Sequence, residues 1–392
     1  MDTLLLVLNA GSSSVKFAAY GDGLEEICSG QAEGLLTAPR FQARRQGCEA
    51  ESHTIPATGH DAAIAFLASW LRGAFPGTGL SAVGHRVVHG GDPAPGPSLV
   101  TDDLLVRLQA LIPQMPLHLP HNLAPIHILR RLLPGLPQVA CFDTSFHRTM
   151  PRVEQLFAIP RALIAEGVRR YGFHGLSYQY VARRLCEVAP EVAGRRVVIA
   201  HLGSGASMCA VEGGRSVATT MGFTGLDGLP MGTRPGAIDP GILLYLMEAK
   251  GLDARAMEDF LYRRSGLLGL SGGISNDMRE LLASDAPEAA EAVDFFVHRC
   301  CREIGSLTAA LHGLDALVFT AGIGERSAAI RAAICRGLDW LGVELDDAAN
   351  AANAATISRP ESRVAVLVVP TDENRVIAED TRSLVQGKER AP

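Results

Sequence analysis

The stretch LLLVLNAGSSSVKF, Leu4–Phe17, decides how the fold of this chain is organised. Five apolar residues predict a buried strand, and the small residues after them predict a tight turn into a second strand that carries Lys16. Gly11 lets the backbone approach a ligand closely, and the serine hydroxyls and backbone N–H groups of such a turn can face an anion. Lys16 adds a positive point charge. The stretch therefore predicts a phosphate-binding turn, with an ordinary Gly-Ser hairpin as the alternative.

The composition is that of a large soluble protein. The chain has 392 residues, of which 47% are hydrophobic and 20% charged, and its formal net charge is −6. This length favours two domains. There is no basic footprint for nucleic acid, no apolar run that could cross a bilayer and no pattern of a secretory signal. The eight cysteines are scattered without CxxC spacing, which indicates reduced thiols. We expect a cytoplasmic protein that binds neither nucleic acid nor membrane.

A second stretch, VVIAHLGSGAS at Val197–Ser207, repeats the organisation of the first. In both places an apolar strand, a Gly/Ser turn, a second strand, a Gly-rich turn and a third strand follow one another, although few residues are identical. This repetition predicts an internal duplication of the fold.

Periodicity and turn signals place the other elements. They predict helices over 61–72, 160–168, 177–188, 287–311 and 375–384, with Ser177 as an N-cap, and buried strands over 82–88, 138–142, 316–320 and 364–369. Prolines predict a rigid irregular loop over 113–125, and residues 92–97 are expected to form a surface loop.

Several polar residues lie at strand ends or in loops of small residues, where binding residues collect. Arg86 ends a strand and Arg234 lies in MGTRPG; such loops let a guanidinium reach a carboxylate or phosphate with two hydrogen bonds. Asp143 and Glu373 each follow an apolar strand, and a cleft, a helix cap or the surface all remain open for them. Gly322–Gly324 fits a phosphate or an adenosine at a helix N-terminus, or a plain β–α turn.

Other motifs exclude several classes of protein. The histidines His118, His174 and His201 lack the spacing of a zinc site. There is no GxxxxGK[ST] sequence and no acidic residue where a dinucleotide-binding fold needs one. There is no GxSxG elbow, so nucleophilic acyl transfer is not favoured.

Seven motifs, taken together, resemble those of the acetate kinase family, the short-chain acyl kinases for acetate, propionate and butyrate within the actin–hexokinase–sugar kinase superfamily. The motifs occur in the family's order: Asn9–Lys16, Gly84–Gly91, Phe142–His147, Arg170–Gly175, His201–Ser207, Met231–Arg234 and Ala321–Glu325. The resemblance covers essentially the whole chain. It implies an α/β fold of two duplicated actin- or hexokinase-like (ribonuclease H-like) domains, each a mixed β-sheet flanked by helices, with the active site in the interdomain cleft.

The resemblance also implies how the chain divides and what it does. Residues 1–144 with 374–392 are expected to form an N-terminal domain that holds the acyl substrate and the phosphate turn, and 145–373 a C-terminal nucleotide-binding domain. The implied reaction is reversible, magnesium-dependent, in-line transfer of the γ-phosphoryl group of ATP to acetate, giving acetyl phosphate and ADP, with propionate as the alternative acceptor. Mn²⁺ is expected to substitute for Mg²⁺, and a homodimer is expected.

Elementary chemistry agrees with this reaction. A carboxylate, with a reference pKa of about 4–5, is already a nucleophile at neutral pH and needs no general base. The site must instead overcome repulsion between two anions and neutralise charge on the transferring group. That task calls for arginines, a hydrogen-bond-donating histidine and a metal ion.

The motif positions imply roles for single residues. The catalytic residues would be Asp143, His174, Arg234, Arg86 and His118. The acyl substrate would bind Arg86 and an apolar pocket of Val88, Leu117 and Phe173, and magnesium would be placed by Asn9 and Glu373. The nucleotide and its phosphates would contact Ser12, Ser14, Lys16, His201, Leu202, Gly203, Ser204, Gly205, Asp277, Met278, Arg279, Gly322, Ile323, Gly324, Glu325 and Arg326.

The chain departs from the family pattern at a few positions. Ser204 and Arg326 each replace an asparagine of the nucleotide motifs, and Gly225 replaces a common proline beside the acyl pocket, which favours a larger pocket. Leu176 and Tyr178 replace a common threonine and histidine. The implied transfer residues are all present, which disfavours a catalytically inactive ATP-binding regulator. A sugar or glycerol kinase is disfavoured because its hydroxyl acceptor needs a carboxylate base. We expect acetate as the preferred acceptor, with propionate accepted.

Overall fold

The chain forms two compact units. The structure, a computed structural model, describes residues 3–91 and 96–387, so that most of the loop expected at 92–97 lies outside the described residues. One unit comprises the residues up to Ser145 together with those from Asp372 onward, and the other comprises Phe146–Thr371. The boundaries expected from the sequence differ from these by one and two residues.

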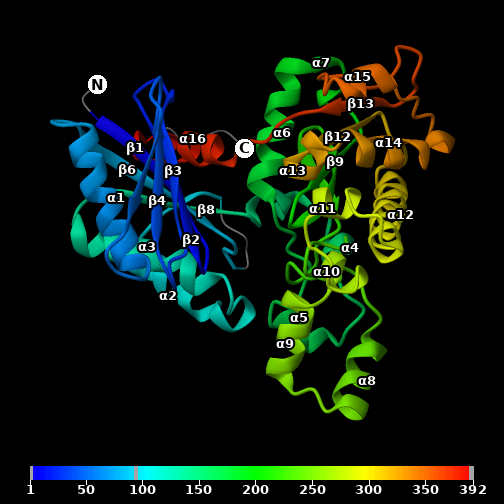
Figure 1. The fold of residues 1–392 in the computed structure, drawn as a ribbon, viewed down its shortest axis with the longest axis horizontal. Coiled ribbons are helices and arrows are strands. Elements are labelled where there is room, and N and C mark those ends of the chain that lie inside the picture. The colour runs from blue at the N-terminus through cyan, green and yellow to red at the C-terminus, as the bar shows by residue number, and fades with distance from the viewer. Residues whose placement is uncertain (1–2, 92–95, 388–392) are drawn as a thin grey trace. The chain divides into compact units, whose positions relative to one another are not determined.

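The first unit is built on an eight-stranded sheet in the order β5-β4-β3-β2-β1-β6-β8-β7 (Figure 1). Its strands are β1 (Thr3–Ala10), β2 (Ser14–Tyr20), β3 (Glu26–Glu33), β4 (Arg40–Arg45), β5 (Ala50–Thr54), β6 (Gly79–Val87), β7 (Ser98–Leu99) and β8 (Gln138–Phe142). Its helices are α1 (His60–Ala74), α2 (Asp102–Ala110), η1 (Ile112–Gln114), α3 (Leu119–Leu132) and α16 (Glu373–Val385), and η2 (Ser145–Thr149) starts at the boundary.

The second unit is built on a five-stranded sheet in the order β11-β10-β9-β12-β13. Its strands are β9 (Val197–Leu202), β10 (Ala206–Glu212), β11 (Arg215–Thr219), β12 (Ala316–Thr320) and β13 (Ala365–Val368). Its helices are α4 (Arg152–Gln155), α5 (Arg161–Ala165), α6 (Gly175–Val188), α7 (Pro190–Ala193), α8 (Pro240–Lys250), α9 (Ala254–Arg263), α10 (Gly266–Leu270), α11 (Met278–Leu282), α12 (Pro287–Ala310), α13 (Ala321–Arg326), α14 (Ala328–Arg336), η3 (Asp339–Leu341) and α15 (Asp347–Ala351).

The two sheets repeat one arrangement, which confirms the predicted duplication. In the first, β1 pairs antiparallel with β2 and parallel with β6, and β2 and β6 continue to β3 and β8. In the second, β9, β10, β11, β12 and β13 repeat this order and these directions. The turn after the first strand is Gly11–Ser13 in one unit and Gly203–Gly205 in the other. The two stretches singled out in the sequence therefore occupy equivalent places.

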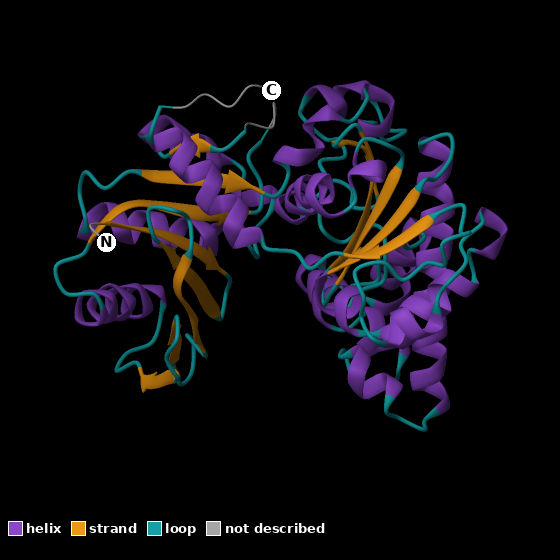
Figure 2. Ribbon diagram, turned by 90° about the horizontal axis from the view of Figure 1, so that it is seen from above, coloured by secondary structure: helices purple, strands orange, loops and turns teal. Residues whose placement is uncertain are grey.

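Helices cover both faces of each sheet (Figure 2). In the first unit, α1 and α3 bury apolar residues against one face of β1, and α16 packs on the other side of β1 and β6. In the second, α6 and α7 cover one face of β9, β12 and β13, while α12 contacts β10 and β11. Burying apolar side chains on both faces explains why the central strands are continuous apolar runs.

One prediction about the backbone was wrong. The proline-rich segment 113–125 is not an irregular loop, because η1 begins at Ile112 and α3 begins at Leu119. Pro120 lies at the start of α3, where its missing N–H has no intrahelical role. Pro125 lies inside α3 and is tolerated there because the helix buries an apolar face that includes Leu123, Ile126 and Leu129.

A second difference concerns the start of α6. The sequence predicts Ser177 as the N-cap, but His174 holds that position with a left-handed φ of 57° and the helix begins at Gly175. Ser177 is instead fully buried in the first turn, where its hydroxyl bonds to His201. The cap position moves because the chain enters the helix through Gly172, which also has a positive φ.

A buried arginine on α14 joins α13 to the segment around α15 through hydrogen bonds. Arg331 on α14 is 0% exposed. Its guanidinium donates to Asn350 Oδ1 at 2.8 Å, to the Asn350 carbonyl at 2.9 Å and to Asn353 Oδ1 at 2.6 Å. It also donates to the carbonyls of Gly324 and Glu325 at 2.9 and 2.8 Å. All five N–H donors are used, so the charge is held by neutral oxygens alone.

None of the described helices is both long enough and apolar enough to cross a membrane. The eight cysteines are all unpaired thiols.

We predict that Arg331→Met lowers the free energy of unfolding by about 3–5 kcal/mol, because three carbonyls and two asparagine side chains lose their donor inside the protein. Equilibrium urea denaturation measures this change. Arg336→Met is the matched control, since Arg336 lies on the same helix and is exposed; it should change the free energy by less than about 0.5 kcal/mol. Equal effects of the two substitutions would contradict the assignment.

Candidate active site

Four predicted site residues of the first unit lie together at one edge of its sheet. Arg86 near the end of β6 forms a two-pronged ion pair with Asp143 after β8, Nε to Oδ1 at 3.0 Å and Nη2 to Oδ2 at 2.7 Å. Its Nη1 donates to Asn9 Oδ1 at 3.5 Å, and its Nε lies 3.7 Å from Glu373 Oε2. The site thus places a guanidinium among an amide and two carboxylates.

The environment keeps this guanidinium charged. Burial by itself would lower the pKa of Arg86, but the carboxylates of Asp143 and Glu373 outweigh it and hold the pKa above its ordinary value. Asp143 is only 2% exposed and both of its oxygens are engaged by Arg86. Its carboxylate therefore orients the arginine.

Asn122 is a functional-site residue that sequence reasoning missed. From α3 its Oδ1 accepts the N–H of Val88 at 3.0 Å, and its Nδ2 donates to the carbonyl of Ala10 at 2.7 Å. It is 4% exposed. Asn122 therefore ties the turn after β1 to the segment after β6. The signal for Asn122 was its place as a polar residue within an apolar helical face. This signal was overlooked because the prolines of the segment predicted an irregular loop.

The predicted phosphate turn has the geometry of a tight hairpin. Gly11 N–H donates to the Ser14 carbonyl at 2.8 Å, and the Gly11 carbonyl contacts His60 Nε2 at 2.8 Å. Ser12 and Lys16 are exposed, and Ser14 is partly exposed. His60, which the sequence did not single out, therefore anchors the turn from α1.

The residues predicted for the acyl pocket fall into both units. Val88 and Leu117 are half-buried residues of the first unit, and Phe173 is a buried residue of the second. His118 is the N-cap of α3, where its carbonyl accepts the Asn122 N–H at 3.1 Å. No single unit brings these residues together, and their common pocket stays a prediction.

Two imidazole rings are stacked in the second unit. The centroids of His174 and His201 are 4.2 Å apart and their planes differ by 19°. His174 Nδ1 bonds to Ser207 Oγ at 2.8 Å, and His201 Nδ1 bonds to Ser177 Oγ at 2.8 Å. Each ring is therefore oriented by a serine hydroxyl, and its Nε2 is turned away from that serine.

Arg234 and His174 approach the second Gly/Ser turn from the same side. A Cβ added to Gly205 would lie 2.8 Å from Arg234 Nη2 and 3.3 Å from His174 Nε2. Only a glycine permits this close approach. Arg234 Nη1 donates to the Gly225 carbonyl at 2.7 Å, and burial lowers the pKa of Arg234, although Tyr262 opposes this shift. No carboxylate among the described residues is ion-paired with Arg234. A guanidinium so placed is an anion-binding group.

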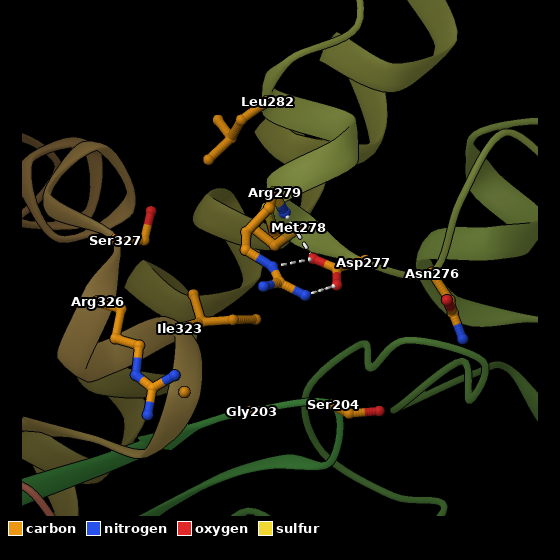
Figure 3. Close-up of a pocket in the computed structure, with 11 residues that line it drawn as sticks. Gly203, Ser204, Asn276, Asp277, Met278, Arg279, Leu282, Ile323, Arg326 and Ser327 are labelled. Carbon is orange, nitrogen blue, oxygen red and sulfur yellow. Dashed lines mark hydrogen bonds and ion pairs between the residues drawn. The ribbon is translucent and has the colours of Figure 1, made fainter. Parts of the chain in front are cut away.

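A pocket of about 390 Å³ lies beside this turn (Figure 3). Eight of the predicted nucleotide residues line it: Gly203, Ser204, Asp277, Met278, Arg279, Gly322, Ile323 and Arg326. Sequence reasoning missed three further lining residues, Asn276, Leu282 and Ser327. Leu282 lies one helical turn after Met278 on α11, and this i, i+4 spacing was the signal that could have found it.

The pocket wall contains a local ion pair. Asp277 accepts the backbone N–H of Arg279 at 2.9 Å and two bonds from its guanidinium, at 3.1 and 2.5 Å. The hydrogen bonds from Arg279 lower the pKa of Asp277 to about 2. Figure 3 shows this pair on α11 and Arg326 on a different element, α13. Two cationic side chains therefore line the pocket.

Two residues predicted to contact the nucleotide have partners within the fold. Glu325 Oε1 accepts the N–H of Ala321 at 2.8 Å and that of Thr371 at 3.0 Å, so its carboxylate caps α13 and holds the segment after β13. Gly324 is a buried residue of α13, and its carbonyl accepts from Arg331 at 2.9 Å. Neither residue lines the pocket, and His201, Leu202 and Gly205 do not line it either.

His147 supports the loop that carries His174. Its Nε2 bonds to the Phe173 carbonyl at 2.9 Å and its Nδ1 to Ser216 Oγ at 2.9 Å. It is 2% exposed, and burial lowers its pKa to about 4. A neutral imidazole with Nε2–H as donor satisfies both bonds.

Comparisons with known proteins cover the whole chain. A model of the acetokinase family matches residues 4–379. A protein of Rhodopseudomonas palustris named acetate kinase is 54% identical over 99% of this chain and 100% of its own length. The solved acetate kinase of Porphyromonas gingivalis has a TM-score of 0.89 at 36% identity, over 97% of this chain and 99% of its own. A solved propionate kinase of Francisella tularensis has a TM-score of 0.92 at 36% identity, over 98% and 100%.

We predict that His147 makes stability fall as the pH falls. Its pKa is about 4 in the folded protein and about 6.5 when unfolded, so its neutral form supports the fold fully above pH 6.5. Between pH 6.5 and 4 the unfolded state takes up the proton first, and stability drops by about 3 kcal/mol over that window. In His147→Gln that part of the pH dependence should vanish in urea titrations. His298→Gln, at an exposed site of the same unit, should retain it, and an unaltered slope in His147→Gln would contradict the prediction.

Proposed function

The chain belongs to the acetokinase family, and from this premise we propose that it transfers the γ-phosphoryl group of ATP to acetate, giving acetyl phosphate and ADP, by direct in-line transfer. Phosphotransfer to a carboxyl group is the activity of this family. The assignment of individual residues and of magnesium goes further and is argued below from the contacts of this chain.

The observation that carries the residue assignment is the two-pronged bond between Arg86 and Asp143. A kinase for sugars or glycerol needs a carboxylate that accepts the proton of the acceptor hydroxyl. Both oxygens of Asp143 are occupied by Arg86, so it is poorly suited to act as that base. An acceptor that is already an anion needs no base, and the Arg86 guanidinium attracts it.

The first unit supplies the acceptor side. Arg86 Nη1, which makes only a long bond to Asn9, is the atom available to the acetate carboxylate. Asp143 holds the guanidinium plane and keeps its charge. Val88 and Leu117 are proposed to face the acetate methyl group together with Phe173, and His118 to donate a hydrogen bond near the substrate. Attack by the carboxylate oxygen on the γ-phosphorus forms the acyl phosphate as the bond to ADP breaks.

The second unit supplies the donor side. Arg234 and His174 converge on the Gly205 turn and are proposed to stabilise the charge that spreads over the equatorial phosphoryl oxygens. The backbone of His201–Gly205 is proposed to follow the nucleotide phosphates. The pocket lined by Asn276–Arg279, Gly322 and Arg326 is proposed to hold the adenosine. Ser12, Ser14 and Lys16 are proposed to contact phosphate oxygens from the turn of the first unit.

The residues expected to place magnesium fit that ion. Asn9 Oδ1 and Glu373 Oε2 both lie within 4 Å of the Arg86 guanidinium, so two hard oxygen donors share one neighbourhood. Mg²⁺ keeps several waters and binds substrate phosphates, so two protein oxygens are sufficient to place it. When bound, the ion would neutralise phosphate charge, and Mn²⁺ is proposed as a substitute.

Acetate is proposed as the preferred acceptor and propionate as a second one. Gly225, which replaces a proline common in the family, lies against Arg234, and a Cβ there would be 2.9 Å from Arg234 Nη1. Its smallness therefore serves the close approach of Arg234 in addition to any effect on pocket size. The likeness to a propionate kinase structure keeps the alternative acceptor in the proposal.

We also propose a cytoplasmic homodimer. The described chain offers a surface for it on α8, whose side chains are all at least partly exposed. Ile242, Leu244, Tyr245 and Met247 are 43–60% exposed there. An apolar helix left in water is costly, and a second copy of the chain would cover it.

Arg86→Ala is predicted to lower kcat/KM for acetate by at least about a thousandfold, because the acceptor loses its counter-charge and the buried Asp143 loses its ion pair with Arg86. Hydroxamate formation from ATP, Mg²⁺ and acetate measures this, with ADP release in the presence of glycerol as the comparison. Arg130→Ala, at a more exposed arginine of the same unit, should retain wild-type activity. An unchanged acetate KM in Arg86→Ala would contradict the proposal that Arg86 binds the acetate carboxylate.

A panel of acetate, propionate and butyrate, each with ATP and Mg²⁺, tests the acceptor. We predict the highest kcat/KM for acetate, with a loss of about tenfold or more for each added methylene, since a pocket discriminates one methylene by roughly 10–200-fold. A value for propionate well above that for acetate would favour a propionate kinase.

A further inference from the structure

A chain of buried hydroxyls lies behind His174. Ser207 Oγ contacts His174 Nδ1 at 2.8 Å and the Tyr178 hydroxyl at hydrogen-bond distance. Tyr178 and Ser207 are both 0% exposed. Tyr178 lies one turn after His174 on α6, and Ser207 lies on β10. Three polar groups from two elements thus form a line that ends on the ring proposed to face the phosphoryl group.

The number of available protons decides which group donates in each hydrogen bond between Tyr178, Ser207 and His174. Ser207 Oγ is the only hydrogen-bond partner of the Tyr178 hydroxyl in the part of the chain that the structure describes. A buried phenol proton without an acceptor is costly, so Tyr178 must donate to Ser207. Ser207 has one proton, which it then donates to His174 Nδ1. Nδ1 is therefore an acceptor, and the proton of the neutral ring lies on Nε2.

The reverse arrangement leaves a buried donor without a partner. If His174 carried a proton on Nδ1, it would donate to Ser207. Ser207 would then either donate to Tyr178, which leaves the phenol proton without an acceptor, or accept from both neighbours through its two lone pairs, which leaves its own proton without one. Burial raises the pKa of Tyr178 well above its ordinary value, so the phenol cannot relieve this by losing its proton. The same argument applies to the doubly protonated ring.

We propose that Ser207, aligned by the Tyr178 hydroxyl, is a positioning residue that holds His174 as a neutral imidazole with its proton on Nε2. The catalytic part of this inference rests on the proposed function. At Nε2 the N–H points toward Gly205, where a Cβ would be 3.3 Å away. His174 then donates a hydrogen bond to the transferring phosphoryl group without having to gain a charge.

The surrounding charges favour the same state. His201 is stacked on His174, and Arg234 Nη2 approaches the same Gly205 position. His147 lies behind Tyr178 with ring centroids 5.5 Å apart, and Cys209 is the next titratable group near the phenol. A positive charge on His174 would be repelled by Arg234. A histidine is common in the family at position 178, so the hydroxyl relay departs from the family pattern.

Nitrogen-15 NMR of histidine-labelled protein tests the proposal without turnover. The neutral ring of His174, assigned with His174→Gln, should show Nε2 protonated and Nδ1 unprotonated. In Ser207→Ala, Nδ1 loses the hydroxyl that donates to it, so an Nδ1-protonated form should appear and the titration midpoint should rise by about one pH unit, a tenfold change. Tyr178→Phe is the matched control, since Ser207 keeps its proton for Nδ1 in that variant; its neutral ring should stay protonated on Nε2 as in the wild type.

Kinetics then test the consequence. At pH 8, Ser207→Ala should lower kcat for acetyl phosphate formation by about two- to tenfold, with KM for acetate and ATP within twofold. A wild-type His174 protonated on Nδ1, or an unchanged tautomer and midpoint in Ser207→Ala, would overturn the proposal. The first result needs no variant, so poor folding of Ser207→Ala leaves the test intact. Absence of acetyl phosphate in the wild type would overturn the proposed function while the NMR result stood.

Discussion

Parallel pairing of strands that are distant in sequence is the constraint on which the site depends. Leu8 lies opposite His85 across β1 and β6, and Val87 opposite Phe142 across β6 and β8. Parallel strands end at the same edge of a sheet, so the residues that follow them become neighbours, as binding sites of α/β sheets require. Asn9, Arg86 and Asp143 meet for this reason. The second sheet repeats the arrangement with β9, β12 and β13, whose ends carry the Gly203 turn, α13 and the segment at Thr371.

Three buried or partly buried arginines differ in the number of hydrogen bonds they make within the protein, and this difference indicates what each one does. Arg331 uses all five donors on neutral oxygens within the fold and has none left for a ligand. Arg86 is held on one side by Asp143, which leaves part of its fork open. Arg234 makes one bond, to a carbonyl, and no ion pair among the described residues. A partly buried guanidinium that has few hydrogen-bond partners within the protein gains more free energy from binding an anionic ligand. By that measure Arg234 is the group most in need of a phosphate.

The sequence predicted the duplicated sheets because they follow from local patterns, whereas most candidate site residues came from the resemblance of the motifs to a family. Apolar runs ending in Gly/Ser turns are visible without any tertiary contact, and so are Arg86 and Arg234 in their loops. The failures concern contacts between distant residues. Pro125 is helical because α3 is buried, and Asn122 matters because it reaches both Ala10 and Val88. A local pattern can mark such a residue as buried, as the apolar face of α3 does for Asn122, but it does not identify the distant residues that it contacts.

The two units hold their polar groups by opposite electrostatic means. A carboxylate orients Arg86 and keeps its guanidinium charged. That charge makes the site favour an anionic substrate over a neutral molecule. His174 is oriented by two hydroxyls, which carry no charge. A carboxylate at that place would stabilise an imidazolium and would add a negative charge close to the proposed position of the phosphates, where it would repel them. A hydroxyl relay fixes the same ring with no such repulsion. An orienting group without charge is therefore the arrangement that an anion-binding histidine beside Arg234 requires.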